Sequence, residues 1–408
     1  MVSFIVPTIS YGDLAVNTRM FVLSSSNNVT VSVVDMVSKY TELLKSIFDF
    51  NEINELLSGA KYFRPFGILI DCNGGAGGAY AKRIFEVELG AGSSVVNHQP
   101  SNHPEALHPS KVGSLHIESE MKSTTKIDFG ATLDTDGSRV ILYGQRGFHI
   151  PAGETIAIIT SHYPMIPYFQ TNSFKGVSRT YFTTSSVDDV IQEGPLKLKK
   201  APGSWLHFNS LMKNECVLIC EDENYGVGSK HVGCSDGIWT ILAWLTMVIH
   251  LYQPVTNILT DHWTEYGRCF LTVYEFHHIG SEIMSNFMRN LKFKIFPTEG
   301  FVGTTYTFDH KSYTVIEAGS MIFQGHVGPE VGFEDGTLRI RVEPKGLILF
   351  TTVSVNGEGT IRIIAEVQTK EIPHNSNKLR VTLPLLKLAM AVSKIECITK
   401  KTYPDLVY

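Results

Sequence analysis

The 408-residue sequence lacks the features that mark several common classes of protein. Its six cysteines form no C-x-x-C pair and no dense framework, which indicates free thiols in a reducing compartment. The 35 Lys and Arg form no long run, and 40 Asp and Glu bring the net charge to −5, which argues against nucleic-acid binding. The most apolar stretch, residues 238–251, is too short for the roughly 20 residues of a membrane span. This stretch predicts a buried helix and no transmembrane segment. Together with the free thiols, it indicates a cytoplasmic protein.

The first 150 residues predict an α/β domain. Apolar side chains at helical spacing, including Tyr40, Leu44 and Phe48, predict one helix over residues 36–58 that ends at Gly59. A strand, a glycine cluster, a helix and two more strands are expected at 66–71, 74–78, 79–89, 127–134 and 138–144.

The rest of the chain divides into two further parts. Residues 151–272 again alternate helices and strands, and strands dominate beyond residue 273 until a final helix at 382–394. The sequence therefore predicts an α/β protein with two α/β domains, at 1–150 and 151–272, followed by an α+β domain at 273–408.

The stretch D-x-D-G-S at residues 134–138 is the first candidate site. Alternate residues of an extended loop point the same way, so Asp134 and Asp136 can converge on one cation. Hard divalent ions such as Mg²⁺ prefer oxygen ligands, and Ser138 offers a neutral hydroxyl where a third carboxylate would complete the site. As a bare pattern, a tight turn with two exposed aspartates explains these residues better than a metal site does.

An acidic loop at residues 220–231 is the second candidate. Asp222, Glu223 and Asn224 follow a buried strand, and carboxylates accept hydrogen bonds from sugar hydroxyls. Loops at strand ends are also where α/β domains bind their ligands. A solvated acidic loop is the alternative interpretation.

Three weaker patterns have simpler explanations. The glycine cluster at 74–78 fails as a dinucleotide fingerprint because Tyr80 stands at the third glycine, so it predicts a packing turn. Ser161 lies in a stretch that resembles a nucleophile loop but continues a helical pattern. Three histidines of a Pro-rich loop could bind metal, although a loop without fixed geometry favours surface histidines. They are His98, His103 and His108.

Taken in order, these stretches resemble phosphoglucomutase, in the α-D-phosphohexomutase family. Residues 29–59 resemble the start of its second domain, and residues 127–142 resemble its metal-loop strand pair, with the family pattern D-G-D-G-D-R. Residues 220–245 resemble its sugar-binding loop, C-G-E-E-S-F-G-T-G-S-D-H, and the helix that follows. Two more matching stretches lie at 261–270 and 301–315.

The resemblance implies domains two, three and four of an enzyme that interconverts glucose 1-phosphate and glucose 6-phosphate. In that family a phosphoserine of the first domain donates the phosphoryl group, and Mg²⁺ on three aspartates stabilises the transfer. The resemblance implies metal-binding positions at Asp134, Asp136 and Ser138. It implies substrate-binding positions at Arg139, Asp222, Glu223, Asn224 and Arg362.

The sequence also departs from the family pattern. It begins where the second domain would begin, so the phosphoserine domain with its T-A-S-H-N-P loop is expected to be missing. Ser138 replaces the third aspartate, and Ser235 replaces a lysine. In the stretch that resembles the family's phosphate loop, residues 351–362, Thr351 replaces the first arginine. Glu358 adds a negative charge in that loop, where only Arg362 survives. A single preorganised donor in such sites is worth roughly 3 kcal/mol, so the losses favour an inactive protein.

These observations predict a catalytically inactive phosphoglucomutase-family protein with a scaffold or binding role. Inactive members of the family associate with junctions, the cytoskeleton or secretory vesicles, so the resemblance implies a protein partner, with glucose phosphates as further ligands and a weakened Mg²⁺ site. One alternative is an active phosphoglucomutase whose phosphoserine domain lies outside this sequence. Another is a sugar-phosphate sensor that depends on Asp222, Glu223 and Asn224.

Overall fold

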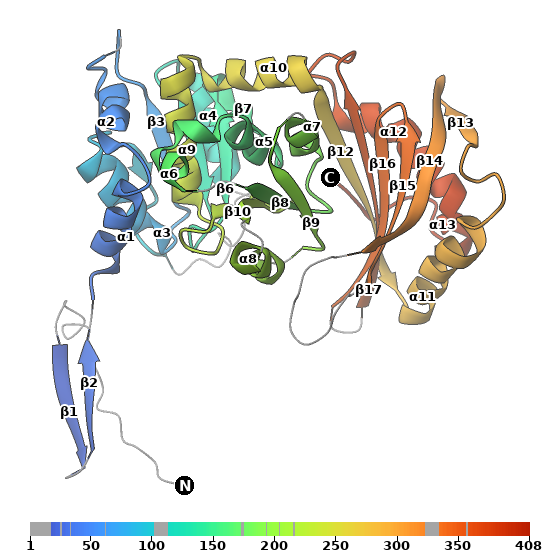
Figure 1. Cartoon of the computed structure of the whole chain (residues 1–408), viewed down its shortest axis with the longest axis horizontal. Coiled ribbons are helices and arrows are strands. Elements are labelled where there is room, and N and C mark those ends of the chain that lie inside the picture. Colours follow the sequence, from blue (N-terminus) through green and yellow to red (C-terminus); the bar gives the residue numbers. More distant parts are fainter. Residues whose placement is uncertain are drawn as a thin grey trace.

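The computed structural model describes residues 18–24, 27–32, 34–61, 63–101, 113–172, 175–192, 194–203, 205–214, 217–322, 334–355 and 358–408. These residues form three mixed or antiparallel sheets with helices around them, and an N-terminal hairpin that projects from the body (Figure 1). The hairpin pairs β1 (Thr18–Ser24) with β2 (Asn27–Ser32). The α/β class predicted from the sequence is confirmed.

The N-terminal unit is built on a five-stranded sheet in the order β4-β3-β5-β6-β7. The strand β3 pairs in parallel with both of its neighbours, β4 and β5, and the last three strands of the order are antiparallel. The strands are β3 (Ile68–Asp71), β4 (Val95–Val96), β5 (Phe129–Leu133), β6 (Val140–Gly144) and β7 (Phe148–His149). The helices are α1 (Met36–Lys45), α2 (Phe50–Ser58), α3 (Gly77–Ala81), the π-helix η2 (Lys82–Glu88), α4 (Gly113–Ser123) and the 3₁₀ turn η4 (Gln145–Gly147).

The single helix predicted over residues 36–58 is wrong, because two helices occupy this stretch. The Asp49 side chain accepts hydrogen bonds from the amides of Asn51 at 2.9 Å and Glu52 at 3.2 Å, and so starts α2 as a new helix. The helix end predicted at Gly59 is confirmed, since this residue caps α2 with a φ of 76°.

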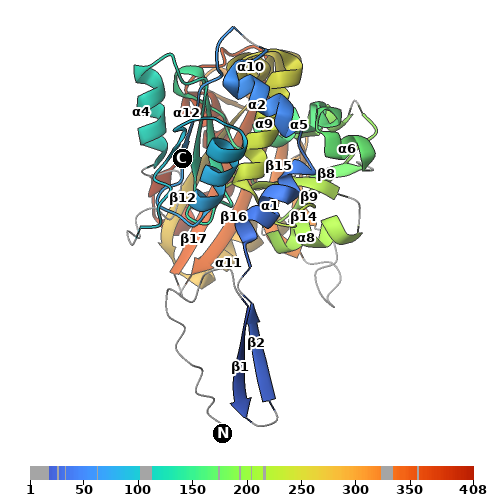
Figure 2. The same cartoon turned by 90° about the vertical axis from the view of Figure 1, so that its left-hand side faces the viewer.

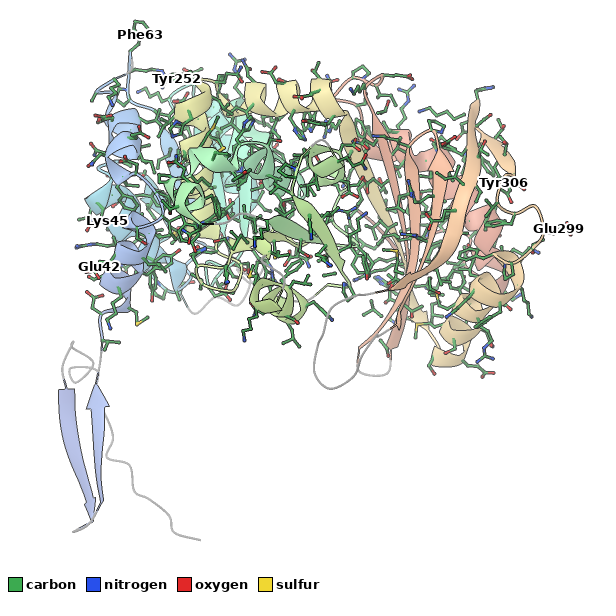
Figure 3. The ribbon with its side chains drawn as sticks, viewed as in Figure 1. Glu42, Lys45, Phe63, Tyr252, Glu299 and Tyr306 are labelled. Carbon is green, nitrogen blue, oxygen red and sulfur yellow. The ribbon has the colours of Figure 1, made fainter. Side chains whose placement is uncertain are left out.

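The helix α1 is amphipathic, as its apolar spacing predicts. Leu44 and Thr41 are buried and α1 packs on α3 and η2, whereas Glu42 and Lys45 project from the outer face (Figure 3). Lys45 also forms an ion pair with Glu88 at 2.6 Å. Figure 2 shows α1 and α2 along the side of the molecule that carries the hairpin.

The middle unit has a four-stranded sheet in the order β11-β10-β8-β9. The strand β8 pairs in parallel with β9 and β10, so the carboxyl ends of all three lie at one edge. The strands are β8 (Gly176–Thr180), β9 (Lys197–Ala201), β10 (Val217–Glu221) and β11 (Val227–Ser229). The helices are α5 (Glu154–Ser161), the 3₁₀ turn η5 (Tyr163–Met165), α6 (Pro167–Thr171), α7 (Ser186–Gln192), α8 (Trp205–Asn214), α9 (Gly237–Leu251) and α10 (Val255–Tyr266).

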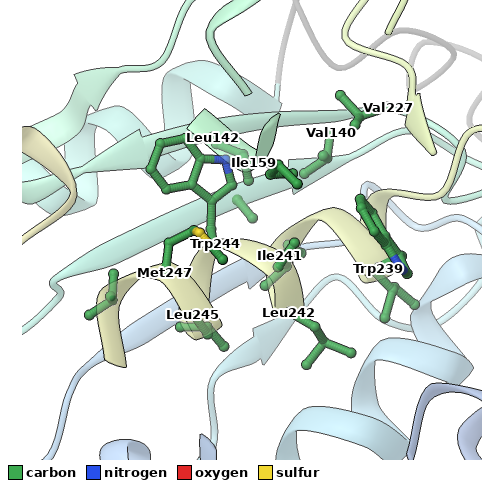
Figure 4. Packing of buried hydrophobic residues seen from close by; sticks show 14 of the residues in the cluster. Val140, Leu142, Ile159, Val227, Trp239, Ile241, Leu242, Trp244, Leu245 and Met247 are labelled. Carbon is green, nitrogen blue, oxygen red and sulfur yellow. The ribbon is translucent and has the colours of Figure 1, made fainter. Parts of the chain in front are cut away.

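The helix α9 joins the first two units into one hydrophobic core. It contacts β6 of the N-terminal sheet and β11 of the middle sheet. Trp239 and Trp244 are fully buried, and Figure 4 shows Trp244 beside Leu142 of β6. The core is continuous across both units. The buried helix predicted from residues 238–251 is therefore confirmed.

In the described part of the chain, no single helix has both the length and the composition of a membrane span. The helices α9 and α10 meet these two criteria only as a pair, and they are bent by 79° relative to each other.

The C-terminal unit is a seven-stranded antiparallel sheet in the order β13-β14-β15-β16-β17-β12-β18. The strands are β12 (Arg268–Ile279), β13 (Thr305–Phe308), β14 (Lys311–Ile322), β15 (Glu334–Glu343), β16 (Gly346–Val355), β17 (Glu358–Thr369) and β18 (Leu406–Val407). Its helices are α11 (Ser281–Asn290), the π-helix η6 (Leu291–Ile295), α12 (Lys378–Ser393) and α13 (Ile395–Thr399).

The two faces of this sheet have different partners. Side chains such as Ile348 and Phe350 pack with the helices, while the alternate side chain Leu349 packs with Tyr181 of the middle unit. The strand β12 begins at Arg268, so the domain boundary expected between residues 272 and 273 falls inside a strand of the C-terminal sheet.

Candidate functional site

The metal loop, residues 134–139, connects β5 to β6. Asp134 is only 3% exposed, and its carboxylate accepts hydrogen bonds from the Ser138 hydroxyl at 3.1 Å and the Arg139 amide at 3.0 Å. Asp136 is exposed and accepts from the Ser138 amide at 2.9 Å. The loop thus brings Asp134, Asp136 and Ser138 together. The alternative, a simple turn, would leave both aspartates exposed, but only Asp136 is exposed.

The two aspartates of this loop differ in their electrostatics. Burial raises the pKa of Asp134, and the nearby charge of Asp136 adds to the effect. Burial also opposes ionisation of Asp136, but hydrogen bonds from Ser138 outweigh it and lower the pKa of that carboxyl. Arg139 lies 3.7 Å from Asp134 and is close enough to attract its charge weakly.

The donors of the metal loop do not match a three-carboxylate Mg²⁺ site. Magnesium requires near-octahedral oxygen coordination, usually with carboxylates and water. The Ser138 hydroxyl donates to Asp134, and the buried Asp134 is already used by its own loop. Across the described ranges, no cluster of three or more His, Cys, Asp or Glu could hold a metal ion. No chemical step of this protein is therefore assigned to a metal.

The glycine cluster at 74–78 packs against the metal loop. The Ala76 amide donates to the Thr135 carbonyl at 2.6 Å, and a Cβ atom on Gly75 would lie 2.3 Å from that carbonyl oxygen. The packing turn predicted for this cluster is confirmed.

The residue after the metal loop contacts the sugar loop, residues 220–231, and the metal loop itself contacts the start of α9. The Val140 amide donates to the Tyr225 carbonyl at 3.2 Å, and the Gly237 amide donates to the Gly137 carbonyl at 2.9 Å. The fold therefore places the two candidate sites side by side, with the start of α9 between them.

Asp222 organises the sugar loop. One of its carboxylate oxygens accepts from the amides of Asn224 at 2.8 Å and Gly226 at 2.9 Å, and the other accepts from Trp205 Nε1 at 2.9 Å. Both oxygens are thus bound by the protein. We infer that this predicted substrate-binding residue shapes the loop.

Glu221 anchors the base of the loop, a role that the sequence analysis missed. Its buried carboxylate accepts from the amides of Gly153 at 2.6 Å and Ile156 at 2.8 Å, at the start of α5. Burial raises the pKa of Glu221 to about 8. An acidic residue in the last position of a buried strand is the only sequence signal for this contact.

Glu223 is half-buried and Asn224 is exposed in the same loop. Thr180 donates to Glu223 at 2.7 Å, and the exposed Asn224 amide group lies 3.5 Å from the other carboxylate oxygen. Burial raises the pKa of Glu223, while the charge of Arg362 opposes the shift. Glu223 of the sugar loop is therefore within electrostatic range of Arg362 on the C-terminal sheet.

Arg362, the surviving arginine of the phosphate loop, is already paired. Its Nε donates to Glu275 at 2.6 Å, and Tyr408 and His277 each bond the same carboxylate at 2.8 Å. Burial opposes ionisation of Glu275, but these three partners lower its pKa. Thr351, the cross-strand neighbour of Arg362, is buried and carries no charge.

The remaining predicted residues lie apart from these loops or cannot be placed. Ser161 is in α5 and donates to the Ala157 carbonyl at 3.1 Å, as expected of a helical residue. His98 lies 3.1 Å from Lys82. His103, His108 and the side chain of Glu358 lie outside the described residues.

A buried polar cluster of the middle unit combines Ser186, His262 and Glu154. Ser186 donates to Glu154 at 2.8 Å, and its hydroxyl lies 3.1 Å from His262 Nε2. Burial raises the pKa of Glu154 to about 7 and lowers the pKa of His262 to about 4. The three side chains are at most 5% exposed, so this serine has no access to a substrate.

Comparisons with known proteins identify the class of this fold and site. The family model described as phosphoglucomutase/phosphomannomutase, alpha/beta/alpha domain III, matches residues 152–266. Parafusin from Paramecium, a phosphoglucomutase whose solved structure is in the open form, superposes with a TM-score of 0.84 at 24% identity. That superposition covers 98% of this chain and 69% of parafusin, which supports a phosphohexomutase fold.

Sequence relatives show to which family within this fold the chain belongs. Phosphoglucomutase-1 of Homo sapiens is 32% identical over 385 residues, which cover 93% of this chain and 67% of the relative. Phosphoglucomutase-like protein 5 of Mus musculus is 29% identical over 385 residues, which cover 92% of this chain and 66% of the relative. The chain belongs to the phosphoglucomutase family.

Proposed function

We propose that this chain is a phosphoglucomutase-family protein that does not interconvert glucose phosphates and instead has a binding role. The observation that carries the proposal is the pairing of Arg362 with Glu275. Phosphoryl transfer depends on positive charge held around the phosphate. Here the surviving arginine is bound to a carboxylate, and Glu223 lies near it.

The metal loop supports the same conclusion. Asp134 is turned toward its own loop, and Ser138 contributes a hydroxyl where the family pattern has a carboxylate. Removing one preorganised donor from such a site costs roughly 3 kcal/mol of transition-state stabilisation. Two such losses together would lower the rate roughly 10⁴-fold.

A binding role requires a partner. We propose a protein partner, as the family resemblance implies. We also propose a cytoplasmic location, because the described cysteines are unpaired; they are Cys72, Cys220, Cys234, Cys269 and Cys397. Glucose phosphates are weak further ligands in this proposal, because Glu223 and Asn224 keep groups that suit sugar hydroxyls.

An activity assay tests the proposal. The purified chain is incubated with glucose 1-phosphate, glucose 1,6-bisphosphate and Mg²⁺, with phosphoglucomutase-1 of Homo sapiens as the positive control. We expect no glucose 6-phosphate above background. Turnover comparable with the control would overturn the proposal. Cross-linking the chain in cell extract, then identifying a specific partner, tests the binding role separately.

The second candidate is an active phosphoglucomutase whose phosphoserine domain is not in this sequence. It is favoured by the relatives, which extend beyond the 67% of their length that this chain matches. Adding the unmatched part of phosphoglucomutase-1 as a separate polypeptide distinguishes the two candidates. Restored turnover would support the second candidate, and continued inactivity would support the first.

A further inference from the structure

The buried Trp263 of α10 is the centre of a junction between the three units. Its ring centre lies 5.9 Å from that of Phe148 in β7 and 5.2 Å from that of His374, which precedes α12. The guanidinium carbon of Arg268, at the start of β12, lies 4.4 Å from the centre of the same indole ring and 4.8 Å from that of Phe270. Figure 1 shows α10 running across the molecule toward β12. The fold thus places a cation where the three units meet.

Lys378, the first residue of α12, adds a second cation to this junction. It lies a short segment beyond His374, whose ring packs on Trp263. Although Lys378 is exposed as a residue, partial burial of its ammonium group lowers its pKa, and the charge of Arg268 lowers it further. The two cations are therefore close enough to repel each other.

Neither cation is neutralised by an ion pair. Among the residues that the structure describes, the side chains of Arg268 and Lys378 have no carboxylate partner and no hydrogen-bond acceptor. Arg362 differs in this respect, because Glu275 accepts from its Nε at 2.6 Å. The Nε of Arg268 is buried, so the terminal nitrogens of its guanidinium are the atoms available to a ligand.

The acidic side chains whose charge acts on this junction are engaged elsewhere. Glu154 acts on Arg268 from the protein interior, where it is 0% exposed. Burial raises the pKa of Glu154 to about 7, so it carries only part of a charge at neutral pH. Glu118 of α4 acts on His149, but it forms an ion pair with Lys122. The junction therefore keeps an excess of positive charge.

His149 of β7 lies on the N-terminal side of this junction, and both cations act on it. Its Nε2 lies 3.3 Å from the Tyr225 hydroxyl of the sugar loop, and the two ring centres are 5.8 Å apart. Desolvation by the surrounding groups lowers the pKa of His149 to about 4, and the charges of Lys378 and Arg268 add to the effect. The imidazole is therefore neutral at pH 7 and can donate a ring N–H to an anion.

We propose that Arg268 and Lys378 form a binding site for a phosphate group, either free or as the ester of a small molecule. The terminal nitrogens of a guanidinium match two oxygens of a phosphate, and an ammonium adds a point charge beside them. A phosphate ester carries about −1.5 to −2 charges at pH 7, which would offset both cations. With His149 as a donor from β7, the bound group would also hold the N-terminal and C-terminal units together.

Titration calorimetry with inorganic phosphate tests the proposal, using the full chain at pH 7 and a constant ionic strength set with chloride. We expect binding at millimolar concentration. Lys378→Gln and Arg268→Gln should each weaken it about tenfold, because each removes one charged contact. Glucose 6-phosphate is titrated in parallel. Tighter binding than inorganic phosphate, with the same loss in Lys378→Gln, would identify an ester as the ligand, and equal or weaker binding would identify free phosphate.

Lys387→Gln is the matched control, because Lys387 is another lysine of α12 and is paired with Asp309. It should leave phosphate binding unchanged, and circular dichroism checks that all variants fold. Arg268 packs on two aromatic rings, so Lys378→Gln, which changes an exposed residue, keeps the test valid if the Arg268 variant unfolds. Absence of binding at millimolar phosphate would overturn the proposal. Loss of binding in Arg362→Gln with full binding in Lys378→Gln would also overturn it, because the phosphate would then lie at the phosphate loop.

A second measurement locates the bound group. Phosphate should raise the pKa of His149 from about 4 toward its ordinary value, because an adjacent anion stabilises the imidazolium. Two-dimensional NMR of the imidazole protons over a pH titration measures this, with sodium chloride at the same ionic strength as the control. An equal rise in chloride would show that salt screening alone acts on His149, and the proposed site would be wrong.

Discussion

The sugar loop and the metal loop lie side by side, but their acidic side chains differ in how many protein donors hold them. In the sugar loop, Glu221 and Asp222 are each held by several protein donors. In the metal loop, Asp136 is exposed and accepts a hydrogen bond from the Ser138 amide. These two acidic residues of the sugar loop thus stabilise the fold around the loop. Position 138, where the family pattern has the third metal-binding aspartate, carries serine.

The largest difference between the loops should appear in stability. Asp222→Ala would leave the buried Gly226 amide, the Asn224 amide and the Trp205 indole without their acceptor, so we expect a loss of about 3 kcal/mol. Urea denaturation followed by tryptophan fluorescence measures it. Asp136→Ala, the matched change in the metal loop, should cost about 0.5 kcal/mol or less. Equal losses would show that the two loops are held in the same way.

The stability of the helix α5, which the sugar loop holds through Glu221, should depend on pH. Burial raises the pKa of Glu154 to about 7 from 4.5, and Glu154 lies on α5, which Glu221 holds from the sugar loop. Between these two values the folded protein binds the proton that the unfolded chain has released, so stability falls as pH rises from about 4.5 to about 7. Glu154→Gln does not titrate and keeps a hydrogen-bond acceptor for Ser186.

We therefore expect Glu154→Gln to be more stable than the parent protein at pH 8, by about 2 kcal/mol, with little difference at pH 4. Thermal unfolding at a series of pH values measures this. Glu282→Gln, an exposed change on α11, is the control and should follow the parent curve. If Glu154→Gln also followed that curve, the buried carboxyl would have no role in the pH dependence.

Much of the fold could be predicted because its signals are local. The apolar run of α9 and the alternation of Leu338 and Ile340 with polar neighbours each fix an element from a few adjacent residues. The break before α2 was missed because it depends on one side chain, Asp49, that caps a new helix inside a continuous apolar pattern.

The candidate site was harder to predict, because its interactions join distant parts of the chain. The loops that carry Asp134 and Glu223 could be found from the spacing of their carboxylates and from the family resemblance. The pairing of Arg362 with Glu275 could not, because 87 residues separate the two along the chain and only the register of β12 against β17 brings them together. The same limit applies to Asp222, which follows β10 and whose indole partner Trp205 lies on α8.

A third prediction restores the missing carboxylate of the metal loop. Ser138→Asp places a third acidic side chain where the Ser138 hydroxyl now lies 3.1 Å from Asp134. If the loop keeps the family geometry, Mg²⁺ affinity should rise about fivefold, because affinity follows the number of charged ligands. Calorimetric titration with MgCl₂ measures the change. The neutral variant Ser138→Asn should bind as the parent does, and an unchanged affinity for Ser138→Asp would mean that these side chains no longer converge.

The smallest expected effect concerns the cation that faces the sugar loop. Glu275→Gln removes the charge that neutralises Arg362 but keeps an oxygen for its Nε, so the arginine becomes available to a phosphate. We expect glucose 6-phosphate to bind about threefold more tightly than to the parent protein, a modest gain because Glu223 still repels the anion. The double variant Glu275→Gln with Arg362→Gln should lose this gain, since it removes the cation that carries it. If both variants bound the sugar phosphate as the parent does, Arg362 would have no part in phosphate recognition, and its pairing with Glu275 could not support the proposed lack of activity.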